Sequence, residues 1–145
     1  MKIQDQDIYH GSALTQIVQH DSFKALNRAS SKYGHYLINK DQHVFVKYRT
    51  NKRSPWSFTL QPDELEAIAA EIKSKKIVFL CVVCGTSTVC ALSQEEIDSV
   101  IDVQSSSPQW VKVSVPKGGS CHVSGSTGKL SKVVPHNSFP EKIFG

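Results

Sequence analysis

The pattern of hydrophobic and polar positions in the first thirty residues predicts helical structure. Ser12 is a residue type that often caps a helix N-terminus. Apolar side chains recur at helical spacing behind it, at Leu14, Ile17 and Val18. Asp21 and Ser22 form a second pair of cap-forming residues. The pattern therefore predicts either one kinked helix or two short helices over residues 12–30.

Two β-prone stretches follow, and they flank the polar sequence NKDQ. This arrangement is typical of a β-hairpin and predicts two strands within residues 34–50. Residues 56–60 alternate aromatic and polar side chains directly after Pro55, which predicts a third strand.

The middle of the chain carries the clearest helical signal. Pro62 suits the first position of a helix, acidic residues follow it, and lysines close the segment near residue 76. Four apolar side chains fall on one side of this helix: Leu65, Ile68, Ala69 and Ile72. Residues 77–84 are all apolar, so both faces of a strand formed by them would be apolar. We therefore expect a central strand that is covered on both faces.

The last third of the chain predicts a turn, a helix and a hairpin. Ser93 and Glu96 have the S-x-x-E spacing of a capping box ahead of an apolar helical stripe. Valines alternate with polar residues over residues 110–115, and residues 121–125 supply a second strand. The whole order predicts one α/β domain over residues 1–145, with a mixed sheet flanked by helices and a C-terminal hairpin. The tail after Leu130 carries no clear pattern.

The distribution of charge adds a possible class of partner. Residues 1–62 carry nine Lys or Arg against four Asp or Glu, a net of +5, and residues 103–145 carry five against one, a net of +4. The segment between them carries three against eight, a net of −5. If the two basic segments meet in space, they form a face that attracts polyanions such as nucleic acid, although a solvated surface is the commoner meaning.

The first residues lack the apolar core of a signal peptide, and the longest apolar run is much shorter than the roughly 20 residues that span a bilayer. We therefore expect a cytoplasmic protein without a membrane partner. The four cysteines are then expected as reduced thiols.

Lys47 lies in the middle of an otherwise apolar strand, HVFVKYR. Alternation along a strand puts Val44, Val46 and Tyr48 on a core face and Lys47 on the other, with His43, Phe45 and Arg49. One interpretation is that this second face lies in water and that the long side chains cover Phe45. The alternative is that Lys47 points into a cleft to meet phosphate or an activated water.

Several stretches of the chain resemble an uncharacterised family of small bacterial proteins. They are YHGSAL, FVKYRTNKRSPWSFTL, VFLCVVCG, VSGSTGKL and NSFPEKIF, and they cover nearly the whole length. This resemblance implies no particular activity.

Residues 12–84 also resemble, more distantly, the restriction-endonuclease-like or PD-(D/E)xK superfamily. The resemblance implies a core of helix, three strands, helix and strand, with Lys47 as the motif lysine and Asp41 as the first acid. Phe45 stands where the motif has an acid or glutamine, and an aromatic ring cannot hold Mg²⁺. The resemblance therefore implies a degenerate nuclease-like core that binds without efficient cleavage.

Other motifs predict structure more readily than chemistry. Cys81 and Cys84 in an extended strand point to opposite faces, unlike zinc ligands on a turn. GSTGK at residues 125–129 lacks the full phosphate-loop spacing and predicts a hairpin turn. The six histidines have no ligand spacing, and His43 is the one that shares a face with Lys47. We expect no metal site and no cofactor.

The sequence thus predicts a binding module for nucleic acid or another polyanion. Basic residues beside aromatic ones are typical of single-stranded nucleic-acid grooves, so the expected contacts are Lys47, Arg49, Lys52, Arg53 and Trp56. A polar turn followed by core aromatics is the structural alternative. Two further hypotheses are an active Mg²⁺-dependent nuclease with Asp41 and Lys47 as catalytic residues, and a protein-interaction subunit, with a homodimer formed through the edge of the terminal hairpin.

Overall fold

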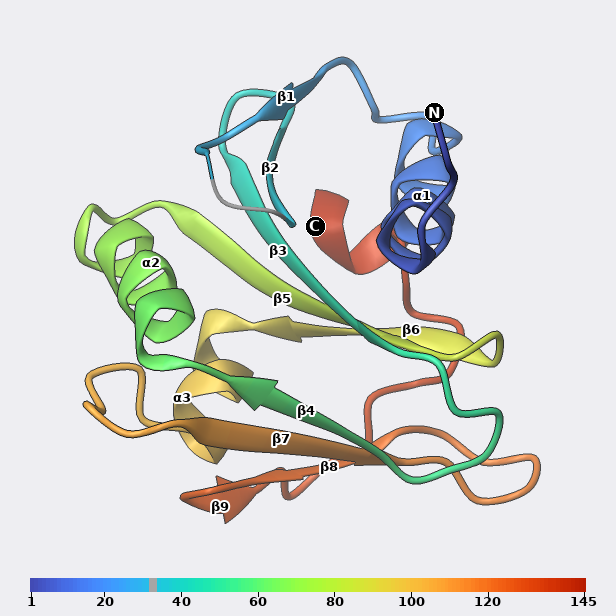
Figure 1. Cartoon of the computed structure of the whole chain (residues 1–145), viewed down its shortest axis with the longest axis vertical. Helices are drawn as coiled ribbons and strands as arrows, with labels where there is room; N and C mark the ends of the chain where they lie inside the picture. Colours follow the sequence, from blue (N-terminus) through green and yellow to red (C-terminus); the bar gives the residue numbers. More distant parts are fainter. Residues whose placement is uncertain (32–33) are drawn as a thin grey trace.

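The computed structural model describes residues 1–31 and 34–145 and shows two β-sheets with helices packed around them (Figure 1). Three α-helices and a terminal 3₁₀ helix occur along the described chain: α1 (Asp5–Val18), α2 (Pro62–Lys73), α3 (Gln94–Val100) and η1 (Glu141–Phe144). These elements form one α+β domain, as the sequence predicts. No helix in the described part of the chain has both the length and the apolar character needed to cross a membrane.

The first sheet has five strands in the order β1-β2-β3-β5-β6. Their bounds are β1 (Leu26–Arg28), β2 (His35–Ile38), β3 (Gln42–Arg49), β5 (Ile77–Cys84) and β6 (Thr88–Ser93). The strands β1, β2 and β3 form an antiparallel meander, β5 lies parallel to β3, and β6 returns antiparallel to β5. The sheet is therefore mixed, and the predicted hairpin over residues 34–50 is confirmed.

The second sheet is antiparallel, with strands in the order β4-β7-β8-β9. Its strands are β4 (Trp56–Leu60), β7 (Gln109–Ser114), β8 (His122–Gly125) and β9 (Gly128–Lys129). The predicted strand at residues 56–60 and the terminal hairpin are both confirmed. However, β4 pairs with β7 and not with the preceding strand β3, so it belongs to a different sheet from the one expected.

The strand β5 explains how the layers hold together. Its side chains alternate between two buried clusters, with Leu80, Val82 and Cys84 in one and Phe79, Cys81 and Val83 in the other. The first cluster lies between the two sheets and includes the apolar sides of α2 and α3. The second lies under α1 and η1, on the opposite face of the five-stranded sheet (Figure 1). The expectation of a strand covered on both faces is confirmed, although β5 lies next to the edge strand β6.

The helix starts show which capping signals were visible in the sequence. In α3, the Ser93 amide donates to Glu96 Oε1 over 2.9 Å, so the predicted capping box is present. In α2, which begins at Pro62 as predicted, the Gln61 amide donates to Glu64 Oε1 over 3.0 Å.

The prediction for the first helix is wrong in its bounds. The helix α1 begins at Asp5, where the Gln4 amide donates to the Asp7 carboxylate over 2.9 Å. Ser12 lies inside the helix, and its hydroxyl donates to the Ile8 carbonyl. The helix ends at Val18, and residues 26–28 form the edge strand β1.

Candidate functional site

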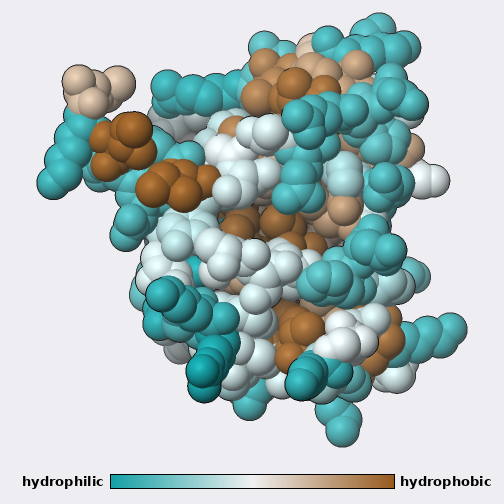
Figure 2. All heavy atoms as spheres, turned by 90° about the vertical axis from the view of Figure 1, so that its right-hand side faces the viewer, coloured by the Kyte–Doolittle hydropathy of each residue, from teal (hydrophilic) through white to brown (hydrophobic). Residues whose placement is uncertain are grey.

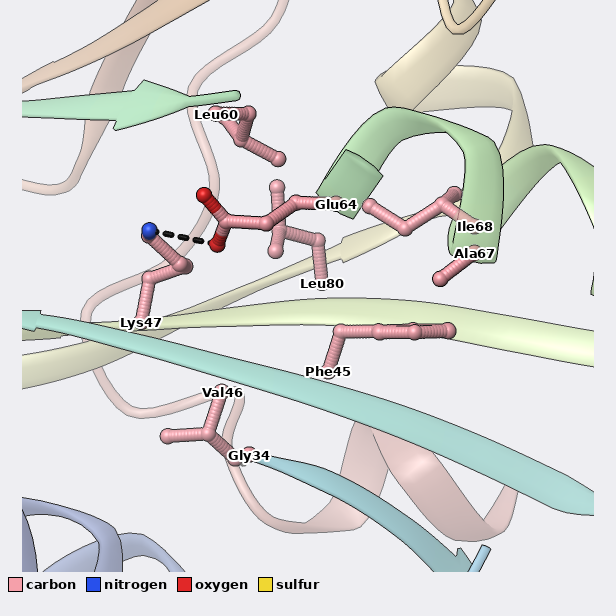
Figure 3. A pocket seen from close by; sticks show the side chains of 9 residues that line it. All are labelled: Gly34, Phe45, Val46, Lys47, Leu60, Glu64, Ala67, Ile68 and Leu80. Atoms are coloured by element: carbon pink, nitrogen blue, oxygen red, sulfur yellow. Dashed lines mark hydrogen bonds and ion pairs between the residues drawn. The ribbon is translucent and has the colours of Figure 1, made fainter. Parts of the chain in front are cut away.

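Lys47 forms an ion pair with Glu64, and the two side chains join β3 to α2 (Figure 3). Lys47 Nζ donates to Glu64 Oε2 over 2.6 Å, and the side chains are 26% and 31% exposed. The other carboxylate oxygen of Glu64 accepts the Gln61 amide at the start of α2. Both oxygens of this carboxylate are therefore engaged, and the cation in the middle of the strand has a structural partner.

The face of β3 that carries Lys47 is covered by α2. Phe45, on the same face, is 8% exposed and lines a small apolar cavity of about 30 Å³ together with Leu60, Ala67 and Leu80 (Figure 3). The interpretation that this face lies in water is therefore wrong for its central part. Val46 and Val44 point to the opposite face, toward α1, as predicted.

Lys47 also borders an open recess between β3, α1 and α2. This recess has a volume of about 190 Å³ and is lined by Gln6, His10, Val46, Lys47, Tyr48 and Glu64. A larger recess of about 470 Å³ adjoins His10 and includes Arg28 and Tyr36. Both recesses are concave, but in the smaller one Glu64 pairs with the Lys47 ammonium.

Asp41 and Lys47 lie far apart in the structure. Asp41 is an exposed turn residue just before β3 begins at Gln42, and Lys47 lies six residues further along an extended strand. Six strand residues span about 20 Å, so these two side chains cannot hold one metal ion or one water. The structure does not bring the two expected catalytic residues together.

Three loops meet at the end of the molecule where β3 and β5 finish. The Gly85 amide, after β5, donates to the Arg49 carbonyl over 3.0 Å, and the Val115 amide, after β7, donates to Ser54 Oγ over 2.8 Å. The loop of residues 50–55 therefore lies between the β5–β6 turn and the β7–β8 loop. Figure 2 views the molecule from this side, with hydrophilic side chains projecting around its lower half.

The charge of this end is uniformly positive. The three loops and the last residue of β3 carry four cations, all on exposed residues: Arg49, Lys52, Arg53 and Lys117. Residues 49–55, 85–87 and 115–121 contain no Asp or Glu. We call these four residues and their loops the basic end. They come from the two basic segments of the sequence, so the segments do meet in space.

Trp56 is buried and holds the loop of residues 50–55 by a hydrogen bond. It is 2% exposed, and its indole Nε1 donates to the Asn51 carbonyl over 2.7 Å. The Asn51 side chain in turn donates to the carbonyls of Arg53 and Pro55. The expectation that Trp56 stacks on a base is wrong because neither face of its ring is available. The structural alternative, a polar turn followed by core aromatics, describes this segment.

A cluster of two histidines and a glutamate lies at the other end of the β3–α2 interface. His35 Nε2 is 3.0 Å from His43 Nδ1, which is 2.9 Å from Glu71 Oε2. Burial lowers the pKa of His35, and the neighbouring His43 lowers it further. These three donor atoms all lie within 4.8 Å of one another, so they could hold a metal ion. No metal site was expected from the sequence, and no ligand spacing in the sequence indicates this cluster.

His10 is the other buried histidine among the described residues. Its Nδ1 is 3.3 Å from the Tyr36 hydroxyl, and its ring lies edge-on to Tyr48. Burial lowers its pKa, and the nearby Lys47 cation adds a smaller effect in the same direction, while Asp7 opposes both. His10 is therefore held in its neutral form between α1 and the sheet.

The cysteines are buried structural residues. Cys81 and Cys84 belong to the two different core clusters, which confirms that they point to opposite faces of β5. Burial raises the pKa of the Cys81 thiol to about 12, so it does not ionise at neutral pH. Cys121 is buried while His122, the next residue, is exposed. Cys81, Cys84, Cys121 and His122 therefore do not form a common metal site.

The sequence GSTGK forms the tight turn between β8 and β9, as predicted. The Thr127 amide donates to the Val100 carbonyl at the end of α3, and the Ser126 amide donates to the Trp110 carbonyl. These amides are therefore engaged in the fold and do not face a phosphate.

Comparisons with protein-family models, with curated proteins and with solved structures gave no match to this chain. The two resemblances noted from the sequence stay predictions.

Proposed function

We propose that this protein binds the phosphate backbone of nucleic acid through the basic end. The observation that carries the proposal is the convergence of four exposed cations, from the end of β3 and two neighbouring loops, at an end whose three loops contain no acidic residue. Phosphate neutralisation by Lys and Arg supplies the electrostatic part of nucleic-acid affinity and needs no base contact. The buried Trp56 anchor supports the proposal because it orders the loop before a ligand arrives.

The proposed contacts differ in part from those expected from the sequence. Arg49, Lys52 and Arg53 stay in the proposal, and Lys117 joins them from the neighbouring loop. Lys47 is left out because Glu64 already pairs with it. Because Trp56 is buried, we expect little preference among bases and no requirement for single strands.

Cleavage is not part of the proposal. A Mg²⁺-dependent nuclease needs hard oxygen ligands beside the scissile phosphate, and Asp41 lies about 20 Å from Lys47 along β3. Incubation of labelled DNA with the protein and Mg²⁺ is expected to leave the DNA intact.

The binding test compares two triple variants that remove the same charge. Fluorescence anisotropy with a labelled oligonucleotide at low salt is expected to detect binding by the wild-type chain. The variant Arg49→Ala/Lys52→Ala/Arg53→Ala should weaken this binding by at least about tenfold. The control variant Lys40→Ala/Lys73→Ala/Lys76→Ala removes exposed lysines from the opposite end of β3 and β5 and should bind almost as the wild type does. Equal losses in both variants would contradict a localised site, and binding of heparin but not of DNA would contradict the nucleic-acid assignment.

A further inference from the structure

The cluster of His35, His43 and Glu71 joins three elements of the fold. His35 lies on β2, His43 on β3 and Glu71 in the last turns of α2. His35 is 5% exposed, and the side chains of His43 and Glu71 are 12% and 23% exposed. The cluster is thus mostly enclosed, with one side open to solvent.

The hydrogen bonds inside the cluster leave more acceptors than donors. A neutral imidazole nitrogen carries either one proton or one lone pair. His43 Nδ1 faces two atoms at once, His35 Nε2 at 3.0 Å and Glu71 Oε2 at 2.9 Å. One proton on His43 can satisfy only one of them well, whereas a cation between the three atoms would accept one lone pair from each.

The hydrogen bond of His35 to Ser30 is compatible with the tautomer that a metal ligand needs. His35 Nδ1 lies 2.9 Å from Ser30 Oγ, so that nitrogen can donate its proton to the hydroxyl and leave the Nε2 lone pair directed into the cluster. An imidazole that binds a metal through one nitrogen usually donates a hydrogen bond from its other nitrogen. The ring is also stacked on Phe45, with centroids 4.0 Å apart and planes inclined by 16°.

We infer that His35 Nε2, His43 Nδ1 and the Glu71 carboxylate form a binding site for a divalent transition metal such as Zn²⁺. Two imidazoles and one carboxylate form a ligand set used for zinc, and imidazole nitrogen selects against Mg²⁺ and Ca²⁺.

Two of the three donor separations fit this ion after a small movement, and all three donor atoms lie within 4.8 Å of one another. Zinc bonds of about 2.0–2.2 Å in tetrahedral geometry place neighbouring ligand atoms roughly 3.3 Å apart. The present separations of 3.0 and 2.9 Å need to open by only a few tenths of an ångström. The fourth position would hold water on the open side. The site would tie α2 to the β2–β3 hairpin, about 13 Å along β3 from Lys47 and separate from the basic end.

In the test, the chelator-treated full chain is titrated with Zn²⁺ and the heat of binding is measured by calorimetry. The melting temperature is then measured with and without Zn²⁺. We expect one bound zinc ion per chain and a higher melting temperature. The variants His43→Ala and Glu71→Gln should each lower the zinc affinity by more than about 100-fold. Two matched controls, the exposed Glu66→Gln on the same helix and the exposed His122→Ala, should bind zinc as the wild type does.

A second measurement on the wild-type chain does not depend on the folding of any variant. Nitrogen NMR of the imidazoles is expected to show zinc-induced shifts at His35 Nε2 and His43 Nδ1. The four other histidines, His10, His20, His122 and His136, should keep their signals. Absence of zinc binding at micromolar concentration, equal binding by the His43→Ala and Glu71→Gln variants, or shifts confined to other histidines would overturn the inference.

Discussion

At the scale of single residues, Lys47 shows how a sequence feature acquires a structural meaning. Strand alternation correctly placed it on the same face as His43 and Phe45. The sequence could not reveal that α2 covers this face, because the contact between β3 and Glu64 joins residues 17 apart through an intervening strand. The sequence left open whether Lys47 lies in water or meets a phosphate, and in the structure its partner is a carboxylate of the protein itself.

The ion pair makes a measurable prediction. A double-mutant cycle with Lys47→Met and Glu64→Gln is expected to give a coupling free energy of about 0.5–1 kcal/mol, because both side chains are partly exposed to solvent. The glutamine side chain keeps an oxygen that can accept the Gln61 amide. The cycle therefore measures the ion pair without the loss of the hydrogen bond that caps α2. Chemical denaturation supplies the four free energies of unfolding, and a coupling of zero would mean that the pair does not stabilise the fold.

His10 gives the protein an acid sensitivity whose sign follows from its environment. Its pKa in the folded state lies below the ordinary value of about 6.5, so the unfolded chain binds this proton more readily. The resulting stabilisation is present above about pH 6.5 and is lost as the pH falls through the folded-state pKa. Asp7, Lys47, Tyr36 and Tyr48 are its titratable neighbours.

The variant His10→Gln is therefore expected to lose less stability than the wild type between pH 7.5 and pH 5. Urea denaturation at each pH gives the free energy of unfolding of both chains. Subtracting one from the other cancels the contribution of groups that titrate alike in the two chains. Parallel pH profiles for the two chains would show that His10 is not held neutral by the fold.

At the scale of elements, the helices α2 and α3 and the strands β3 and β5 could be predicted because their signals are local. A proline, acidic first turns, an S-x-x-E box and a regular apolar pattern all lie within one segment. The helix α1 was misplaced because Gln4 and Asp7 form its cap, a less familiar pair than Ser with Glu. The strand β1 has only three residues, all exposed, and so has no hydrophobic pattern.

The contact between α3 and the β8–β9 turn depends on glycine. A Cβ atom at Gly125 would meet the carbonyl oxygens of Val100 and Trp110 well inside contact distance. Gly125→Ala is therefore expected to lower the free energy of unfolding by about 1–3 kcal/mol. Gly11→Ala is the matched control, because nothing lies within 4 Å of its Cβ position in α1. There alanine should stabilise the helix by roughly 0.5–1 kcal/mol, and equal effects at both positions in thermal unfolding would contradict this packing.

At the scale of the whole molecule, the sequence predicted the class of fold but not how its two sheets divide. The pairing of β4 with β7 joins segments about fifty residues apart, and no local pattern specifies it. The histidine cluster was partly accessible to prediction. The register of the predicted hairpin places His35 and His43 on one face of neighbouring strands, but Glu71 joins them only through the packing of α2.

The predicted homodimer depends on a free edge of the terminal hairpin. In the structure β9 pairs with β8, and a bridge between Cys121 and Val134 lies just before the start of β8. This arrangement reduces the edge that a second copy could use. Sedimentation at several protein concentrations remains the measurement for this prediction.

The salt dependence of DNA binding shows whether the basic end neutralises phosphates. If four cations each neutralise one phosphate of a duplex, the logarithm of the binding constant should fall with the logarithm of salt concentration with a slope of roughly −3 to −4. Arg53→Ala should reduce the magnitude of this slope by about one, and Lys73→Ala at the opposite end should leave it unchanged. A slope near zero, or one that Arg53→Ala does not alter, would contradict the account.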